Sequence, residues 1–248
     1  MYRRIDPQEI VKTLERLAQR VEERFPGSSL SRVVAELLIV AQEATQRAQR
    51  NQRPILALRG LMVLLLGVIG FSLIELPLRL RLGEVDSVAQ LVQVLEPSIS
   101  IAFFLSAFAV YLLSIETGIK RNRTLQALHE LRAIAHVVDM HQLTKDPATL
   151  LEGGASTRSS PQRTMTDFEL IRYLDYCSEI LALISKIAAL YVQGFTDPGA
   201  IASVDEVENL TSGLSRKIWQ KLTIVQGERG PVQSSVPPRE IPNVSAPL

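Results

Sequence analysis

The sequence contains a single cysteine, Cys177, in 248 residues. One cysteine cannot form an intramolecular disulfide, and a cysteine-rich metal site is excluded as well. The chain also has almost no net charge, because 27 lysine and arginine residues oppose 26 aspartate and glutamate residues. No overall positive field therefore favours nucleic acid, and we expect no nucleic-acid partner. Cys177 lies in a helical pattern and is predicted to be a small core residue.

The sequence also lacks the short motifs that mark common catalytic and nucleotide sites. It has no nucleophile elbow, Walker loop, dinucleotide-binding glycine pattern, HExxH or kinase signature. The pair Gly153-Gly154 has neither a strand before it nor a lysine after it. We therefore predict that the protein is not an enzyme, and we expect neither a cofactor nor a bound metal.

The N-terminus lacks the short apolar run and small-residue cleavage site of a secretory signal. Long apolar runs are instead concentrated in two stretches, at about 55–76 and 99–119. Each reaches the roughly 20 residues that cross about 30 Å of hydrocarbon. We predict two transmembrane helices that form a hairpin over 55–119, with an external loop at 78–96. The alternative is a pair of buried helices in a soluble protein, where a run such as LMVLLLGVIGF is rare.

Basic residues flank the outer ends of this hairpin. They are Arg47, Arg50 and Arg53 before the first span, and Lys120, Arg121 and Arg123 after the second. The connecting segment has only Arg79 and Arg81. Because basic residues accumulate on the cytoplasmic side of a membrane protein, we predict that both termini are cytoplasmic. The protein is then a multi-pass protein of the plasma or inner membrane.

Antiparallel pairing of the two spans brings Arg59 and Glu116 to a similar depth near the cytoplasmic boundary. One hypothesis is an ion pair between them, which would be less screened there than on a soluble surface. The alternative is that each side chain extends separately to the lipid headgroups.

Small residues form candidate packing faces in both spans, because helices in lipid associate through close approach of small side chains. These residues are Gly60, Gly67, Gly70, Ala102, Ser106 and Ala109. One such face closes the hairpin, and a second face favours self-association.

Outside the spans, residues 1–54 predict two cytoplasmic helices separated by Pro26-Gly27. Asp6 and Pro7 supply a cap and a first-turn proline for the first of them. No proline lies between Pro97 and Pro147. We therefore predict that the second span continues as one helix to about residue 144.

Residues 120–226 are predicted to be a cytoplasmic helical domain, interrupted by a flexible linker at 147–165 that is rich in Gly, Ser, Thr and Pro. Thr166 and Glu169 form a capping box for the next helix. That helix is apolar nearly all round between residues 180 and 192, which predicts the buried centre of a bundle; a third span is the alternative.

A turn is expected at 196–199, and the last helix is expected to start at Ser203 with Glu206 as its capping-box partner. Residues 227–248 are predicted to be a disordered tail.

All three histidines fall within residues 129–141. At 100° per residue, His129, Arg132, His136 and Asp139 lie on one stripe of a helix. The favoured interpretation is a polar face that bonds to neighbouring helices. A sharper hypothesis is that rings of these residues line a cytoplasmic vestibule in an oligomer. A zinc site would need ligands from elsewhere, and the chain has no further histidine.

These features together predict an all-α protein, a two-span transmembrane helical hairpin with a cytoplasmic helical bundle. The first functional hypothesis is a non-enzymatic scaffold or signalling component, which forms a homo-oligomer in the lipid bilayer and offers its cytoplasmic helices to a protein partner. The alternative is a homo-oligomeric ion channel or pore whose vestibule is lined by His129, Arg132, His136 and Asp139. An accessory subunit of a membrane enzyme or transporter is the third option.

Overall fold

The computed structural model describes residues 4–52, 55–82, 88–143, 145 and 165–227. All regular structure in these residues is helical. The helices are α1 (Pro7–Arg24), α2 (Ser29–Gln52), α3 (Leu56–Leu82), α4 (Val88–Leu143), α6 (Asp167–Val192) and α7 (Pro198–Gly227). The predicted all-α class is confirmed.

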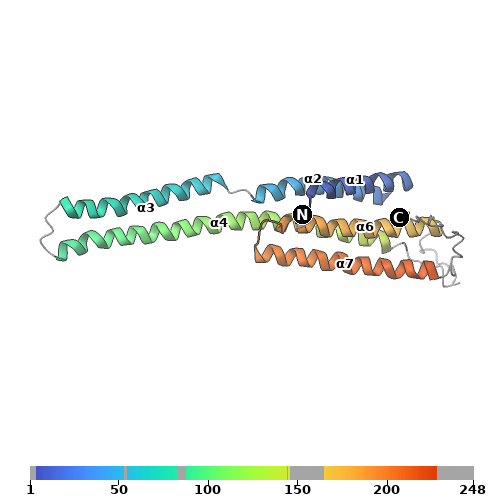
Figure 1. Ribbon diagram of the computed structural model, residues 1–248. Coiled ribbons are helices and arrows are strands. Elements are labelled where there is room, and N and C mark those ends of the chain that lie inside the picture. The colour runs from blue at the N-terminus through green and yellow to red at the C-terminus, as the bar shows by residue number, and fades with distance from the viewer. Residues whose placement is uncertain (1–3, 53–54, 83–87, 144, 146–164, 228–248) are drawn as a thin grey trace, which may run out of the picture.

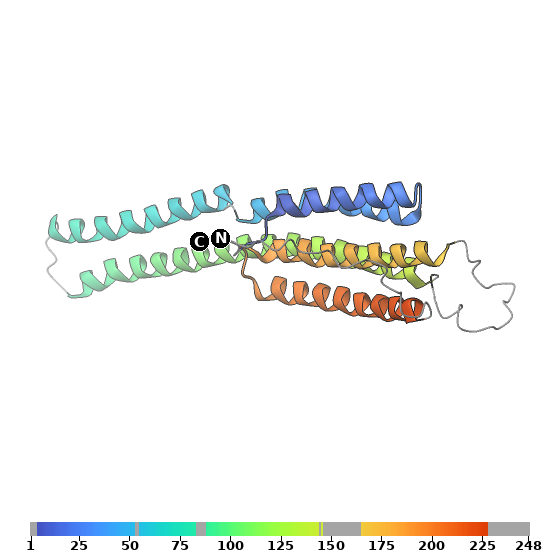
Figure 2. The same cartoon turned by 45° about the vertical axis from the view of Figure 1, so that its right-hand side comes forward.

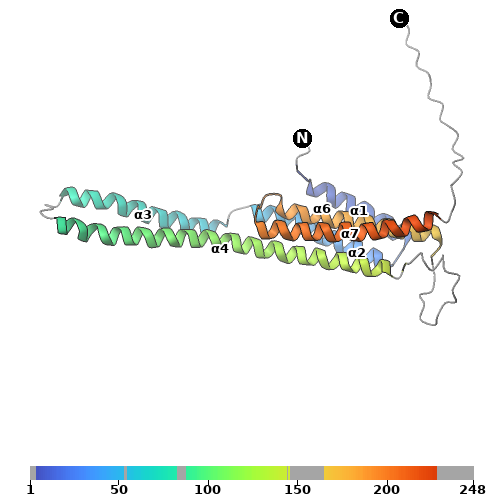
Figure 3. The same cartoon turned by 90° about the horizontal axis from the view of Figure 1, so that it is seen from below.

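The helices form two regions that share the long helix α4 (Figure 1). We call the first region the hairpin: α3 lies along the N-terminal half of α4, and Figures 2 and 3 show the same pairing from other directions. We call the second region the bundle: α2, α6 and α7 pack on the C-terminal half of α4, and α1 covers α2 and α6. With 56 residues, α4 extends over about 84 Å. Its end at Leu143 confirms the predicted continuous helix.

The pair α1 and α2 forms as the sequence predicts. Asp6 Oδ1 accepts a hydrogen bond from the backbone N–H of Gln8 at 2.9 Å, and Pro7 occupies the first helical position. Gly27 has φ 66°, a left-handed conformation that glycine adopts at no steric cost, so it permits the reversal between the two helices. One side of α1 is buried throughout; it comprises Ile10, Leu14, Leu17 and Val21.

Helix α6 is the centre of the bundle, because α1, α2, α4 and α7 all contact it. Its capping box is present: the backbone N–H of Glu169 donates to Thr166 Oγ1, and the Thr166 N–H donates to Glu169 Oε2. Between residues 180 and 192, these four neighbours leave only a narrow strip of α6 exposed, at Ala182 and Lys186, which explains why this helix is apolar nearly all round. The predicted buried centre is confirmed. Burial raises the pKa of the Cys177 thiol to about 12, in keeping with a core residue.

Helix α7 begins five residues earlier than expected. Asp197 Oδ1 accepts from the N–H of Ala200 at 3.0 Å, and Pro198 is the first helical residue. The expected turn at 196–199 is therefore a helix start, and Ser203 and Glu206 lie inside the helix. The physical reason is the Asp-Pro pair, which combines a cap with a preset φ as Asp6-Pro7 does in α1.

The segment expected as an external loop, 78–96, is mostly helical. Helix α3 continues to Leu82 and α4 starts at Val88, so both helices extend beyond the predicted ends of the spans. Within the described part of the chain, one segment is long and apolar enough to cross a membrane, Ile99–Leu143 in α4. The apolar part of α3 is shorter, Leu56–Phe71, so the first span, at 55–76, and with it the two-span hairpin stay predictions.

The predicted linker and tail lie outside the described residues, apart from Met165 and Gly227.

Candidate functional site

Three charged side chains meet where the hairpin joins the bundle. Glu116 is almost fully buried, with 6% of its surface exposed. Lys120 Nζ lies 2.7 Å from Glu116 Oε1, and Arg59 Nε lies 4.0 Å from Glu116 Oε2. The backbone N–H of Ile55 donates to Glu116 Oε1 at 3.3 Å. We call Arg59, Glu116 and Lys120 the boundary cluster.

Local helix geometry assembles the boundary cluster. Glu116 and Lys120 are four residues apart on α4, with the acid on the N-terminal side, which is the favoured order for such a pair. Ile55 directly precedes α3, where backbone N–H groups have no partner within the helix. The Glu116 carboxylate satisfies one of these N–H groups and so ties the start of α3 to α4.

Antiparallel pairing of the two helices predicts that Arg59 and Glu116 lie close together. In the structure Arg59 Nε is 4.0 Å from Glu116 Oε2. The prediction missed the closer partner, Lys120, and the backbone N–H of Ile55. The signal for Lys120 is its spacing of four residues from Glu116, which predicts an ion pair on one face of a helix.

An open cleft of about 270 Å³ lies over the boundary cluster. It is lined by Arg59, Leu113, Glu116, Thr117, Lys120, Gly194 and Phe195. Gly194 and Phe195 come from the turn between α6 and α7, which lies at the end of the bundle nearest to α3 (Figure 1). The cleft therefore has contributions from both regions of the molecule, and its walls combine two cations and one carboxylate with apolar side chains.

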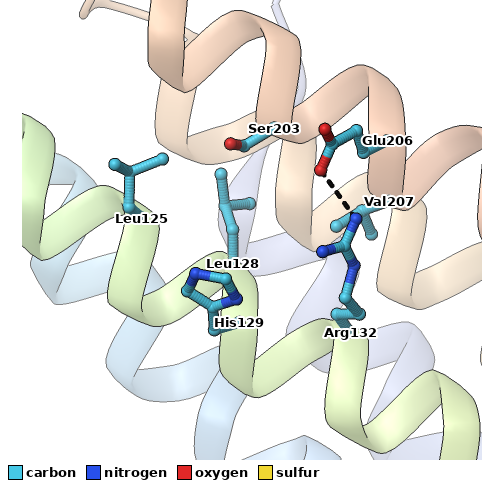
Figure 4. A pocket seen from close by; sticks show the side chains of 7 residues that line it. All are labelled: Leu125, Leu128, His129, Arg132, Ser203, Glu206 and Val207. Carbon is cyan, nitrogen blue, oxygen red and sulfur yellow. Dashed lines mark hydrogen bonds and ion pairs between the residues drawn. The ribbon is translucent and has the colours of Figure 1, made fainter.

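The predicted polar stripe lies on the bundle half of α4, and its residues His129 and Arg132 lie beside α7 (Figure 4). Arg132 crosses to α7 and pairs with Glu206 at 2.6 Å. His129 lines a small pocket between the two helices, together with Leu125, Leu128, Arg132, Ser203, Glu206 and Val207. The ion pair between Arg132 and Glu206 is a contact between helices, as expected for a polar face that bonds to its neighbours.

The other two residues of the stripe do not pair with each other. Among the described residues, the Asp139 carboxylate accepts from Gln142 Nε2 at 2.6 Å, and the His136 side chain is exposed. His141 lies off the stripe, where Ser29 Oγ is 3.4 Å from its Nδ1. Burial lowers the pKa of His141, and the positive charges of Arg32 and Lys145 lower it further.

The side of α3 that faces α4 in the hairpin carries mainly large residues, with Gly70 beside them. The less exposed positions of α3 are Leu58, Met62, Leu65, Ile69 and Gly70, and those of α4 are Ala102, Leu105, Ala109, Leu112 and Ile115, besides Glu116. Four of the α3 positions recur at steps of four, three and four residues, which places them on one side of the helix. Ala102 and Ala109 therefore belong to the hairpin contact, as part of the predicted packing faces.

Gly60, Gly67 and Ser106 of the predicted faces are exposed and lie outside that contact. A Cβ atom built on Gly60, Gly67 or Gly70 meets no described atom within 4 Å. At 100° per residue, Gly60 and Gly67 lie on the opposite side of α3 from Met62 and Ile69. Ser106 is exposed, and its hydroxyl donates to the Ala102 carbonyl at 2.7 Å. The side of α3 that carries Gly60 and Gly67, which we call the glycine face, is thus open.

Within the described residues, no three His, Cys, Asp or Glu side chains are grouped so as to hold a metal ion. Comparisons of the chain with protein families, curated proteins and solved structures found no match. Function is therefore inferred from the residues of this chain alone.

Proposed function

We propose that the protein is a two-span integral membrane protein with a cytoplasmic helical bundle, and that it acts as a self-associating scaffold which presents the bundle to a protein partner. One observation carries the proposal. Helix α4 passes without a break from a half with large exposed apolar side chains to a half whose outer side is mainly polar.

The exposed apolar side chains of the hairpin require a non-aqueous environment. Phe103 and Phe104 are 69% and 70% exposed, and Phe71 is 66% exposed. Transfer of apolar surface from water to an apolar medium is favourable by about 25 cal/mol per Å². A soluble monomer rarely leaves such a continuous apolar surface in water. Lipid around both α3 and the N-terminal half of α4 accounts for it.

The orientation follows from charges at the junction of the two regions. Lys120, Arg121 and Arg123 follow the apolar half of α4 at the end where the bundle begins. Basic residues beside a span favour the cytoplasmic side. The bundle, which begins there, is therefore placed in the cytoplasm, together with both termini.

The glycine face supports self-association. Gly60 and Gly67 are two turns apart on the side of α3 that α4 does not cover. In lipid, the close approach of backbones at small residues is a main source of helix association. A second copy of α3 is the simplest occupant of this face in a membrane.

The pore alternative receives less support from the same geometry. Its vestibule needs His129, Arg132, His136 and Asp139 to face an open axis. Arg132 is instead paired with Glu206 of α7, and Asp139 with Gln142 of α4. Rings of free charges are therefore not available from these two residues without breaking bonds within each chain.

Membrane insertion is tested by extracting membranes that contain the full chain with alkaline carbonate. We expect the protein to stay in the membrane pellet and to be released by detergent. A reporter fused to the C-terminus is expected to be active only in the cytoplasm. Release by carbonate, or a periplasmic reporter, would overturn the proposal.

Self-association is tested with Gly67→Leu in nanodiscs, with mass as the readout. Added bulk on the glycine face is expected to weaken association about tenfold, a loss of about 1.4 kcal/mol. Ala107→Leu is the matched control, because Ala107 is exposed on α4 and its substitution adds the same kind of bulk. A wild-type chain that stays monomeric, or equal effects of the two substitutions, would contradict a role for this face.

A further inference from the structure

We infer that the cleft over the boundary cluster binds the phosphate headgroup of an anionic phospholipid of the inner leaflet. This inference rests on the proposed membrane location of the hairpin, and it goes beyond that proposal by assigning a specific lipid site.

The cleft lies where the surface of α4 changes from apolar to charged. Val110 and Leu113 are exposed on the hairpin side, at 63% and 47%. Lys120 and Arg121 follow about two turns later, on the bundle side. A second open cleft, on the neighbouring side of α4, shows the same change, because it is lined by Val110 and Leu113 at one end and Arg121 at the other. A phospholipid changes in the same way along its length, from apolar acyl chains to a charged phosphate.

The charges in the cleft leave a positive excess. Arg59 and Lys120 carry two positive charges and Glu116 carries one negative charge, so the cluster has a net charge of +1. A phosphodiester headgroup carries a single negative charge that matches this excess. Inner-leaflet anionic lipids also accumulate beside basic juxtamembrane residues.

Arg59 supplies free hydrogen-bond donors. Lys120 and the N–H of Ile55 are both directed at Glu116 Oε1. The Arg59 Nε is 4.0 Å from Glu116 Oε2, which is beyond the distance of a hydrogen bond, and its side chain is 57% exposed. Within the described residues, the guanidinium has no closer acidic partner. Its planar donors match two phosphate oxygens, which is why arginine is common at phosphate sites.

The apolar lining favours a lipid over free phosphate. Leu113 and Phe195 form part of the cleft wall beside the cations. These side chains add nothing to the binding of a small hydrated anion. They provide a surface for the glycerol and upper acyl region of a lipid whose phosphate lies between Arg59 and Lys120.

The test measures the lipids that stay bound to the full chain by native mass spectrometry. The protein is taken from nanodiscs of phosphatidylcholine mixed with phosphatidylglycerol. We expect the wild-type chain to retain phosphatidylglycerol preferentially. Arg59→Gln is expected to lower that preference about tenfold, the scale of one charge-assisted pair.

Arg123→Gln is the matched control, because Arg123 is exposed on α4 outside the cleft and its substitution removes the same charge. It is expected to leave the preference nearly unchanged. Equal losses in the two variants would indicate diffuse surface charge and overturn the site. Displacement of phosphatidylglycerol by millimolar inorganic phosphate would identify a free-anion site and overturn the lipid assignment.

Carbonate extraction of the same preparations separates this inference from the proposed function. If the wild-type chain leaves the membrane, the proposed function fails and the lipid site fails with it. If the chain stays in the membrane but shows no preference for phosphatidylglycerol, only the lipid site is overturned.

Discussion

The hairpin and the bundle use the same side of α4 and differ on the opposite side. In the hairpin, Ala109 and Leu112 are buried against α3; in the bundle, Leu131 and Val138 are buried against the other helices. The outer positions of the hairpin half are Phe103, Phe104 and similar apolar residues, whereas those of the bundle half are mainly charged or polar. The two halves of α4 therefore differ in their exposed residues, while the buried side of the helix continues through both. The proposed membrane location of the hairpin accounts for this difference.

This difference changes what a buried side chain contributes. In water, burial of an apolar side chain removes it from solvent and is strongly favourable. In lipid, the surrounding acyl chains are as apolar as the side chain, so packing and polar bonds decide how helices associate. Substitutions that are chemically identical should therefore have unequal effects in the two regions.

The largest effect is expected for a leucine in the seam of the bundle. Leu131→Ala should lower the free energy of unfolding by about 3 kcal/mol, because it removes a fully buried side chain and leaves a cavity. Leu112→Ala makes the same change on the side of α4 that faces α3. In the proposed membrane location lipid can replace the lost contacts there, so this variant should cost less than about 1 kcal/mol. Thermal loss of helical circular dichroism in nanodiscs measures both variants.

Equal losses in these two variants would contradict the comparison. They would indicate that the two halves of α4 are stabilised in the same way, and the hairpin would then have no distinct lipid environment.

The second effect is expected at the junction of the two regions. Glu116→Gln should destabilise the pairing of α3 with α4 by about 2 kcal/mol, because Lys120 loses its charged partner in a site with little exposure. The double variant Glu116→Gln with Lys120→Met removes both charges and should recover most of this loss. The same thermal measurement applies, and a double variant less stable than the single one would show that the pair is not what stabilises the junction.

The helices themselves were largely predictable from local signals. The spacing of Asp6 to proline and of Thr166 to glutamate predicts a cap at each residue, and a helix starts directly after both in the structure. The same signal at Asp197 was misread, because Thr196 and Gly199 on either side of Asp197-Pro198 are typical of a turn. These few residues fit a turn and a helix start equally well. In the structure Asp197 is buried and its carboxylate caps the helix, which selects the helix start.

The candidate sites were less predictable, because they depend on how helices face one another. The depth of Arg59 and Glu116 followed from antiparallel pairing alone. The glycine face did not, since small residues on α3 fit the hairpin contact and an external contact equally well. Only the packing of Met62 and Leu65 toward α4 leaves the glycines open. The cleft needs the turn at Gly194 and Phe195, which is remote in sequence from both spans.

The third effect tests the revised start of α7 in the bundle. Asp197→Ala should lower the free energy of unfolding by about 1 kcal/mol, since it removes the cap that accepts from Ala200. Ser203→Ala is the matched control, because Ser203 lies inside the helix and should have a much smaller effect. Urea unfolding in detergent micelles measures both. A larger loss in the free energy of unfolding for Ser203→Ala than for Asp197→Ala would indicate that the helix starts at Ser203 instead.

The smallest effect is a pH dependence confined to the bundle. Burial and the charges of Arg32 and Lys145 lower the pKa of His141 in the folded protein below its ordinary value of 6.5. The unfolded chain then binds a proton more readily than the folded chain. The free energy of unfolding should be unaffected above about pH 6.5 and should fall as the pH decreases below that value, until the folded ring is protonated as well.

The variant His141→Gln should abolish this decrease. His136→Gln is the matched control, because His136 is on the same helix with its side chain exposed to solvent, and it should retain the decrease. All three histidines lie on the bundle half of α4, so the hairpin has no group of this kind to titrate. A stability that falls equally in both variants would assign the pH dependence to other groups, and the bundle would lose this distinction from the hairpin.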